Sequence, residues 1–283
     1  MTTEAHDRLV PRRRPRPTTT RGSPLLRALA DLWEGLLAFR FWGVLGWSEI
    51  RQQYKRSTFG PLWITLSMAI FISLLGVLYA QLFQRDLASY IPHLAIGYII
   101  WNVISGFIES GTRTFINAEG IIKQLAAPLS VHAYRIAWVS LITLTHHSVI
   151  IAAVLAIFTV PPTAQWALVL PGLTLIFLTG IWVCLLLGMI CTRFRDVPQI
   201  VQSVMRVLFF LTPVIWQADL MPRRAVFLTA NPIYHYIELI RAPLLNKPID
   251  WLHWFIAGAI TALGWIVTIA VYRRFRQRVA YWL

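Results

Sequence analysis

Long apolar stretches without charge divide this chain into segments that are each long enough to cross a lipid bilayer. Four stretches contain no acidic or basic residue, namely 57–84, 87–108, 136–192 and 251–272. A helix needs about 20 apolar residues to cross the hydrocarbon core, so 136–192, which is broken by Pro161-Pro162, has room for two crossings. A fifth stretch, 197–218, is apolar except for Arg206 near its middle. The pattern predicts six transmembrane helices.

The six helices predict an all-α membrane protein with a transmembrane domain over residues 61–283. We place the helices at 62–83, 92–112, 133–158, 166–190, 199–217 and 251–272. The segment 218–250 contains a charge-free run, 225–237, which is too short to cross and is interrupted by Asn231-Pro232. We expect a re-entrant pair of half-helices in the outer leaflet there. A plain helix on the outer surface is the alternative.

The first 60 residues contain no such run and divide into two parts. Residues 1–23 combine Arg12-Arg13-Arg14 with prolines and threonines and show no apolar periodicity, which predicts a disordered basic tail. This tail serves as a topology signal or is attracted to anionic lipid. In 24–60, apolar residues recur at helical spacing after Ser23, which can cap a helix. We expect an amphipathic helix in the membrane interface, with packing on a partner protein as the alternative.

The composition excludes an ordinary soluble enzyme and locates the two sides of the membrane. Hydrophobic residues make up 57% of the chain and charged residues only 13%, against about a quarter in soluble proteins. In a polar protein the net charge of +14 would indicate nucleic acid, but here eleven basic residues lie in the first 62 positions. Lysine and arginine gather in cytoplasmic segments. An even number of crossings therefore puts both termini in the cytoplasm, and no nucleic-acid partner is expected.

Residues that bind metals or catalyse reactions on lipid-linked sugars are sparse. Cys184 and Cys191 lack metal-ligand spacing, and the adjacent His146 and His147 point to different helix faces, so we expect no metal site. The chain has only 12 acidic residues, and five of them precede residue 50. A membrane-embedded glycosyltransferase or phosphatase would need clustered acids or histidines at one membrane face. This pattern argues against such an enzyme.

Several stretches resemble one family of transporters. They are 47–63, with Trp47, Arg51, Tyr54, Lys55, Gly60 and Pro61; 191–199, with Arg193, Arg195, Asp196 and Pro198; 209–216, with Thr212-Pro213; and Asn231-Pro232. In their residues and in their order along the chain they are similar to the permease subunits of bacterial polysaccharide ABC exporters, which export O-antigen, capsule or teichoic acid. The resemblance covers residues 40–272. It implies that Arg51, Tyr54 and Lys55 belong to an entry segment.

The same resemblance assigns a coupling role to two cytoplasmic links. The loop 113–132 contains a short amphipathic pattern, and the family places a helix there that docks on an ATPase subunit, with Asn117, Glu119 and Lys123 as its polar residues. The turn with Arg193, Arg195 and Asp196 is implied to lie near the same subunit. The alternatives are a connector packed on its own membrane domain and a basic anchor of a helix end.

Aromatic residues are the candidates for a sugar pathway. The resemblance implies that the first and fifth spans line the conduit, which would place there Tyr79, Phe83, Phe209, Phe210 and Trp216. Aromatic faces complement the C–H faces of sugars, but aromatic belts also occur in any membrane protein. Arg206, inside the fifth span, either meets the phosphates of a lipid-linked substrate or extends to the cytoplasmic headgroups.

No nucleotide-binding motif occurs in the chain, which has no G-x-x-x-x-G-K-[ST] and no Gly-Lys pair. We therefore expect ATP and Mg²⁺ to be held by a separate ATPase subunit, in two copies, on a homodimer of this chain in the bacterial inner membrane. The expected cargo is a polyprenyl-linked polysaccharide of the O-antigen type. The alternatives are capsule, teichoic acid, a drug or a simpler lipid.

Overall fold

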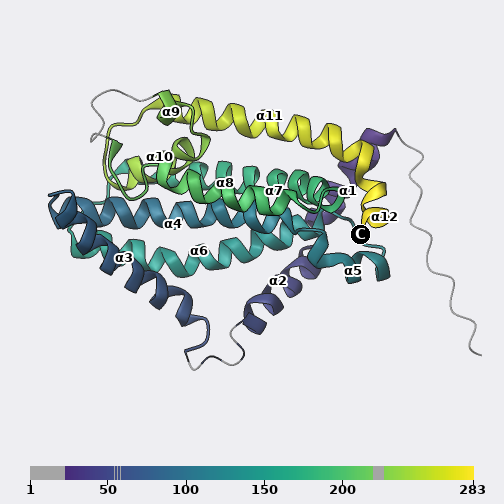
Figure 1. The fold of residues 1–283 in the computed structure, drawn as a ribbon, viewed down its shortest axis with the longest axis horizontal. Coiled ribbons are helices and arrows are strands. Elements are labelled where there is room, and N and C mark those ends of the chain that lie inside the picture. Colours follow the sequence, from purple (N-terminus) through teal and green to yellow (C-terminus); the bar gives the residue numbers. More distant parts are fainter. Residues whose placement is uncertain (1–22, 54, 56, 58, 219–225) are drawn as a thin grey trace, which may run out of the picture.

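The computed structural model describes residues 23–53, 55, 57, 59–218 and 226–283, and in these residues every regular element is a helix (Figure 1). The helices are α1 (Pro24–Leu37), α2 (Phe39–Gln53), α3 (Leu62–Leu82), α4 (Leu87–Thr112), η1 (Ile116–Ala118), α5 (Glu119–Gln124), α6 (Val131–Ile157), η2 (Ala164–Leu168), α7 (Val169–Arg193), α8 (Val197–Leu211), α9 (Val226–Thr229), α10 (Pro232–Leu244), α11 (Trp251–Phe275), η4 (Arg276–Arg278) and α12 (Val279–Trp282).

Five apolar helical segments are long enough to cross a membrane. They are Leu62–Leu82, Leu87–Thr112, Val131–Ile157, Ala164–Arg193 and Trp251–Trp282. Each corresponds to a stretch with few or no charges in the sequence. The prediction of an all-helical protein with several transmembrane helices is confirmed for the described residues.

The fifth predicted span differs from the others because its helix is short. The sequence placed it at 199–217, whereas α8 has 15 residues and ends at Leu211. At 1.5 Å per residue, α8 is about 22 Å long, less than the hydrocarbon thickness of about 30 Å. Pro213 explains the early end, since proline disfavours a helical conformation in the residue before it. Thr212 accordingly has an extended backbone, with φ −86° and ψ 135°.

The interfacial region consists of two helices, α1 and α2, that are separated at Ala38. Trp42 closes this break by donating from Nε1 to the carbonyl of Leu36 at 3.3 Å. α2 packs closely on α6 at Gly46, where a Cβ atom would lie 2.9 Å from Trp138. The end of α2 and the start of α3 point away from the other helices, so that the two helices form a V at the lower edge of Figure 1. The predicted tail 1–23 lies, except for Ser23, outside the described residues.

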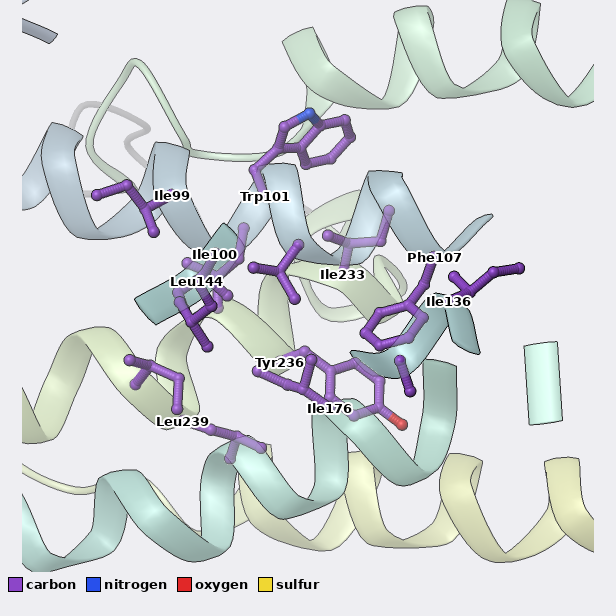
Figure 2. Packing of buried hydrophobic residues seen from close by; sticks show 14 of the residues in the cluster. Ile99, Ile100, Trp101, Phe107, Ile136, Leu144, Ile176, Ile233, Tyr236 and Leu239 are labelled. Carbon is purple, nitrogen blue, oxygen red and sulfur yellow. The ribbon is translucent and has the colours of Figure 1, made fainter. Parts of the chain in front are cut away.

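α4 is the central helix of the bundle and contacts α3, α6, α7, α8 and α10. Figure 2 shows Ile100 and Phe107 of α4 packed among side chains of α6, α7 and α10. Small residues permit the close approach of α4 and α7. A Cβ at Gly180 would lie 2.4 Å from the Phe107 ring, and one at Gly111 would lie 3.2 Å from the backbone of Cys184. Packing through small residues is typical of helices in membranes, where apolar burial alone gives little drive for association.

α10 is enclosed by protein on most sides, since it contacts α4, α7 and α11. The Tyr236 hydroxyl lies 2.8 Å from the Thr179 hydroxyl and donates to the carbonyl of Ala257 at 3.0 Å. Asn231 caps the start of α10, and its Nδ2 donates to Thr212 at 2.7 Å. α10 lies toward the end of the molecule that holds the α3–α4 turn, while α1, α5 and α12 lie at the opposite end (Figure 1).

Candidate functional site

The link between α4 and α6 contains α5. Its first part is buried in the protein, whereas α5 lies at the surface. Phe115 is fully buried and packs edge-on against His132, with ring centroids 6.4 Å apart, and Ala118 is buried as well. α5 itself has no buried residue. Isolated helices of this length are marginal in water, and here an ion pair at 2.6 Å joins Lys123 Nζ to Glu119 Oε1. α5 therefore lies at the surface, and the buried residues Phe115 and Ala118 before it hold it in place.

Positive charge surrounds the carboxylate of Glu119. The hydrogen bond from Lys123 lowers the pKa of Glu119 most, and the charge of Arg195 lowers it further. Arg195 belongs to the turn 193–196 after α7, and its Nη2 donates to the carbonyl of Trp282 in α12 at 3.4 Å. α12 in turn contacts α5. We refer to α5, the turn 193–196 and α12 together as the α5 face.

The remaining predicted coupling residues lie on or beside the α5 face. Arg193 and Asp196 are exposed, and the Arg193 guanidinium lies 6.0 Å from the centre of the Phe194 ring. Asp196 precedes α8 without a capping hydrogen bond, and it forms no ion pair with another described residue. Asn117 is exposed two residues before Glu119.

One carboxylate, Asp31 on α1, connects three segments behind the α5 face. It accepts hydrogen bonds from the backbone N–H groups of Leu129 and Ser130, at 3.3 and 3.2 Å, just before α6. It also accepts from the Tyr272 hydroxyl at 2.5 Å and pairs with Arg276 at 3.0 Å, at the end of α11. The Asp31 side chain is only 10% exposed. The interfacial helix α1 is thereby tied to the end of the α5 link and to the last long helix.

Tyr79 and Phe83, predicted to line a conduit, lie at the end of α3 away from the α5 face. Their rings are stacked with centroids 5.7 Å apart. Phe83 also lies 6.3 Å from the Tyr90 ring on α4. Both side chains are half-buried in a small cluster with Leu94, so one side of each ring is used for packing within the chain.

Phe209, Phe210 and Trp216 gather around the end of α8. Phe209 is half-buried against Trp101, with ring centroids 5.3 Å apart. Phe210 follows it on the open side and is 69% exposed. Trp216 Nε1 donates to the Phe210 carbonyl at 3.0 Å, which folds the segment after α8 back onto the helix. Of the five predicted aromatic residues, Phe210 is the one that presents most of its side chain to the outside.

α8 has three distinct faces. Its buried face includes Met205, and its exposed apolar face consists of Ile200, Val204, Val207 and Leu211. Between these faces runs an exposed polar stripe at positions i, i+4 and i+7, formed by Gln199, Ser203 and Arg206. We call these three residues the α8 polar stripe. Polar side chains exposed on a helix of a membrane bundle are costly against lipid, so this stripe calls for water or another protein surface.

A cavity of about 450 Å³ lies between α2, α4, α6 and α8. Its lining is mostly polar and includes Glu49, Asn102, Glu109, Ser110, Arg113, Asn117, Arg135, Ser140, Thr143, His147 and Gln202. Arg135 pairs with Glu49 across it at 3.4 Å. Gln202 links this polar cavity to the α8 polar stripe, because the Gln202 carbonyl accepts a hydrogen bond from Arg206 Nε at 3.4 Å.

The sequence did not single out this polar cavity, although a signal for it exists. Asn102, Gly106 and Glu109 are spaced i, i+4 and i+7, which puts them on one face of α4, and Arg113 follows at i+11 as the C-cap of the helix. The matching residues on α6 and α2 cannot be found from spacing, since their meeting depends on the tertiary fold.

Of the predicted entry segment, Arg51 and Lys55 are exposed. Tyr54 lies outside the described residues.

Comparison with known proteins gives two findings. The model of the ABC-2 type transporter family matches residues 40–245, which is most of the chain. Two relatives from Klebsiella pneumoniae, both named O-antigen export system permease protein RfbA, are 22% and 20% identical over 236 residues. Each match covers 82% of this chain and 90% of the relative.

Proposed function

Because the chain belongs to the ABC-2 type transporter family, and is therefore a transport subunit that spans the membrane several times, we propose that it exports a lipid-linked polysaccharide. The single observation that carries the cargo is the similarity to two permeases of O-antigen export over nine-tenths of their length. The α8 polar stripe supports a hydrophilic pathway, since it offers Arg206 beside two smaller polar groups on an exposed face.

The energy source is a separate ATPase subunit that docks on the α5 face. The sequence contains no phosphate-binding motif of the form G-x-x-x-x-G-K-[ST]. The α5 face offers exposed charged groups of both signs within one surface, Glu119, Lys123 and Arg195, and it rests on buried residues that can transmit a displacement. Two ATPase subunits, which hold ATP and Mg²⁺, serve two copies of this chain. The α5 face is then cytoplasmic, and so are both chain termini.

The pathway forms between two copies of the chain. The exposed apolar faces of α3 and α8 need lipid or a partner, and the α8 polar stripe needs a surface other than lipid. A second copy related by twofold symmetry would meet both requirements, with the two polar stripes facing one water-filled path. Phe210 is placed beside this path to contact sugar faces, and Arg206 is placed to contact a phosphate.

The polar cavity is proposed as the place where the cargo's headgroup enters from the cytoplasmic leaflet. It adjoins α2, whose last turn carries Arg51, and it reaches the α8 polar stripe at Gln202. A path along polar groups from the interface to α8 avoids exposing sugars to the hydrocarbon core.

At the opposite end, the extended segment 212–216 completes the crossing that α8 begins, which makes six crossings in the bacterial inner membrane. α9 and α10 form the re-entrant pair. Enclosure of α10 by α4, α7 and α11 supports this arrangement, since backbone that does not cross is tolerated at membrane depth only where protein covers it.

The test is to isolate the tagged chain in mild detergent from its native membrane and identify its partners by mass spectrometry. We expect an ATPase subunit with a phosphate-binding loop in equal number with this chain. Deletion of the gene should then cause polyprenyl-linked glycan to accumulate on the cytoplasmic side. Recovery of the chain without an ATPase, under conditions that preserve other membrane complexes, would contradict the proposal.

A further inference from the structure

A second cavity lies at the end of the molecule away from the α5 face, beside α4 and α10. Its volume is about 330 Å³, at the lower end of the range for small-ligand pockets. It is lined by His93, Gln217, Ala218, Tyr234, Glu238, Arg241 and Lys247. Nothing in the proposed export function requires a site here, because the α8 polar stripe lies elsewhere on the surface.

Arg241 is the decisive residue, because it is charged, fully buried and only partly bonded. Its Nη1 donates to the carbonyl of Pro213 and to Glu238 Oε1, both at 2.9 Å. Its Nε and Nη2 atoms have no hydrogen-bond partner among the described residues. A guanidinium carries five N–H donors, and burying some of them unpaired is costly. Arg241 therefore keeps N–H groups on Nε and Nη2 that could donate to a ligand with several acceptor oxygens.

The position of this guanidinium is built into the fold. A Cβ atom at Gly97 on α4 would lie 1.8 Å from Arg241 Nη2, so the side chain fits only because residue 97 is glycine. A purely structural role, holding the Pro213 carbonyl, requires only Nη1. That role leaves Nε and Nη2 unexplained.

The charges around the cavity favour an anion. Among the described residues that line it, Arg241 and Lys247 are cationic and Glu238 is the one carboxylate. His93 is 3% exposed, and its Nδ1 also lacks a partner among the described residues. Guanidinium groups bind phosphate oxygens through two parallel hydrogen bonds, and a lysine adds a point charge. We propose that this cavity binds a phosphate group, carried either by a lipid headgroup or by a free phosphate ion.

The test is a binding measurement on the full chain in a maltoside detergent, which itself carries no phosphate. Inorganic pyrophosphate is titrated in one arm and phosphatidylglycerol in mixed micelles in the other. We expect saturable binding that Lys247→Gln weakens about tenfold, the effect of losing one charge-assisted contact. Glu238→Gln should tighten binding, because it removes the competing negative charge while its amide oxygen can still accept from Arg241. Lys123→Gln on the α5 face is the matched control and should change nothing.

The two arms identify the source of the phosphate. Binding in both arms, or of phosphatidylglycerol alone, supports a lipid headgroup as the occupant, and binding of pyrophosphate alone supports a free ion. If neither probe binds, or if binding ignores both Lys247→Gln and Glu238→Gln, the cavity holds only water and the proposal is overturned. Arg241→Lys, checked by its thermal unfolding, tests whether the two-pronged guanidinium is needed. None of these results depends on export, so the proposed function stands or falls separately.

Discussion

Asp31 illustrates how one carboxylate can hold distant segments of a membrane protein together. Its partners Ser130 and Arg276 lie 99 and 245 residues away in the sequence. Each bond alone is modest, but a largely buried carboxylate leaves its donors unpaired when it is removed, and that loss is larger than the bond itself. The contacts also fix α1 relative to the link that carries α5, so Asp31 acts on both stability and the placement of the α5 face.

Asp31→Asn tests this network. The change removes the charge that pairs with Arg276, and one side-chain amide cannot accept from every present donor. We expect a loss of about 2–4 kcal/mol in the free energy of unfolding, measured as a lower melting temperature in detergent. Asp196→Asn is the control, because Asp196 is exposed and should change stability by less than about 0.5 kcal/mol. Equal melting temperatures for the two variants would refute the role of Asp31.

The residues of α5 separate coupling from stability. Glu119→Arg combined with Lys123→Glu preserves an ion pair at the same spacing but reverses both charges on the α5 face. Stability should stay within about 0.5 kcal/mol, since both side chains are exposed. We expect membrane insertion and ATP hydrolysis to persist while export falls at least tenfold. Lys123→Gln, which reverses no charge, serves as the milder comparison, and normal export in the double variant would exclude α5 as the coupling element.

At the scale of helices, the close contact of α4 with α7 depends on missing side chains. Gly180→Ala places a methyl group where the buried Phe107 ring now lies, 2.4 Å from its nearest atoms. Overpacking of this kind costs about 1–3 kcal/mol. Gly258→Ala in α11 is the matched control, because its Cβ would meet nothing within 4 Å and it adds helix propensity. A thermal unfolding assay should find the first variant less stable and the second unchanged or more stable.

The sequence predicted some helices far better than others, for a physical reason. The spans at 87–112 and 131–157 stand out because absence of charge over about 20 residues has few explanations besides a crossing. The predicted span 199–217 extends beyond the end of α8, since apolar character continues past Leu211 although Pro213 ends the helix. The break at Ala38 could not be predicted, because no proline or glycine marks it. Hydropathy shows whether a segment lies in lipid or in water, but it does not show where a helix ends or breaks.

In the candidate functional sites, contacts between residues close in sequence could be predicted, whereas contacts between distant residues could not. Glu119 and Lys123 lie four residues apart, a spacing that puts both on one side of a helix, and they pair in the structure. The arrangement of Arg241 over Gly97 joins positions 144 apart, and only the packing of α10 on α4 brings them together. Pairs of this kind leave no local pattern, so they cannot be predicted from a single sequence.

At the scale of the whole molecule, the apolar faces determine how copies of the chain can meet. α11 and α8 both expose large apolar side chains, but only α8 has a polar stripe beside them. A helix surrounded by lipid gains nothing from that stripe, whereas a helix at a twofold axis can turn it toward water. α8 is therefore expected at the interface between two copies, and α11 at the lipid.

Cysteine cross-linking in membranes separates these positions. Val207→Cys on the exposed apolar face of α8 should give a covalent dimer with an oxidant or a short bis-maleimide, whereas Val267→Cys on α11 should not. The two positions are comparably exposed, at 60% and 50%, and the native Cys184 and Cys191 are fully buried, so reactivity alone cannot produce the difference. The same chemistry at Val204 should behave like Val207, one turn along the face. Cross-linking through α11 but not α8 would place the pathway outside the α8 polar stripe, and the export route proposed here would then have to be abandoned.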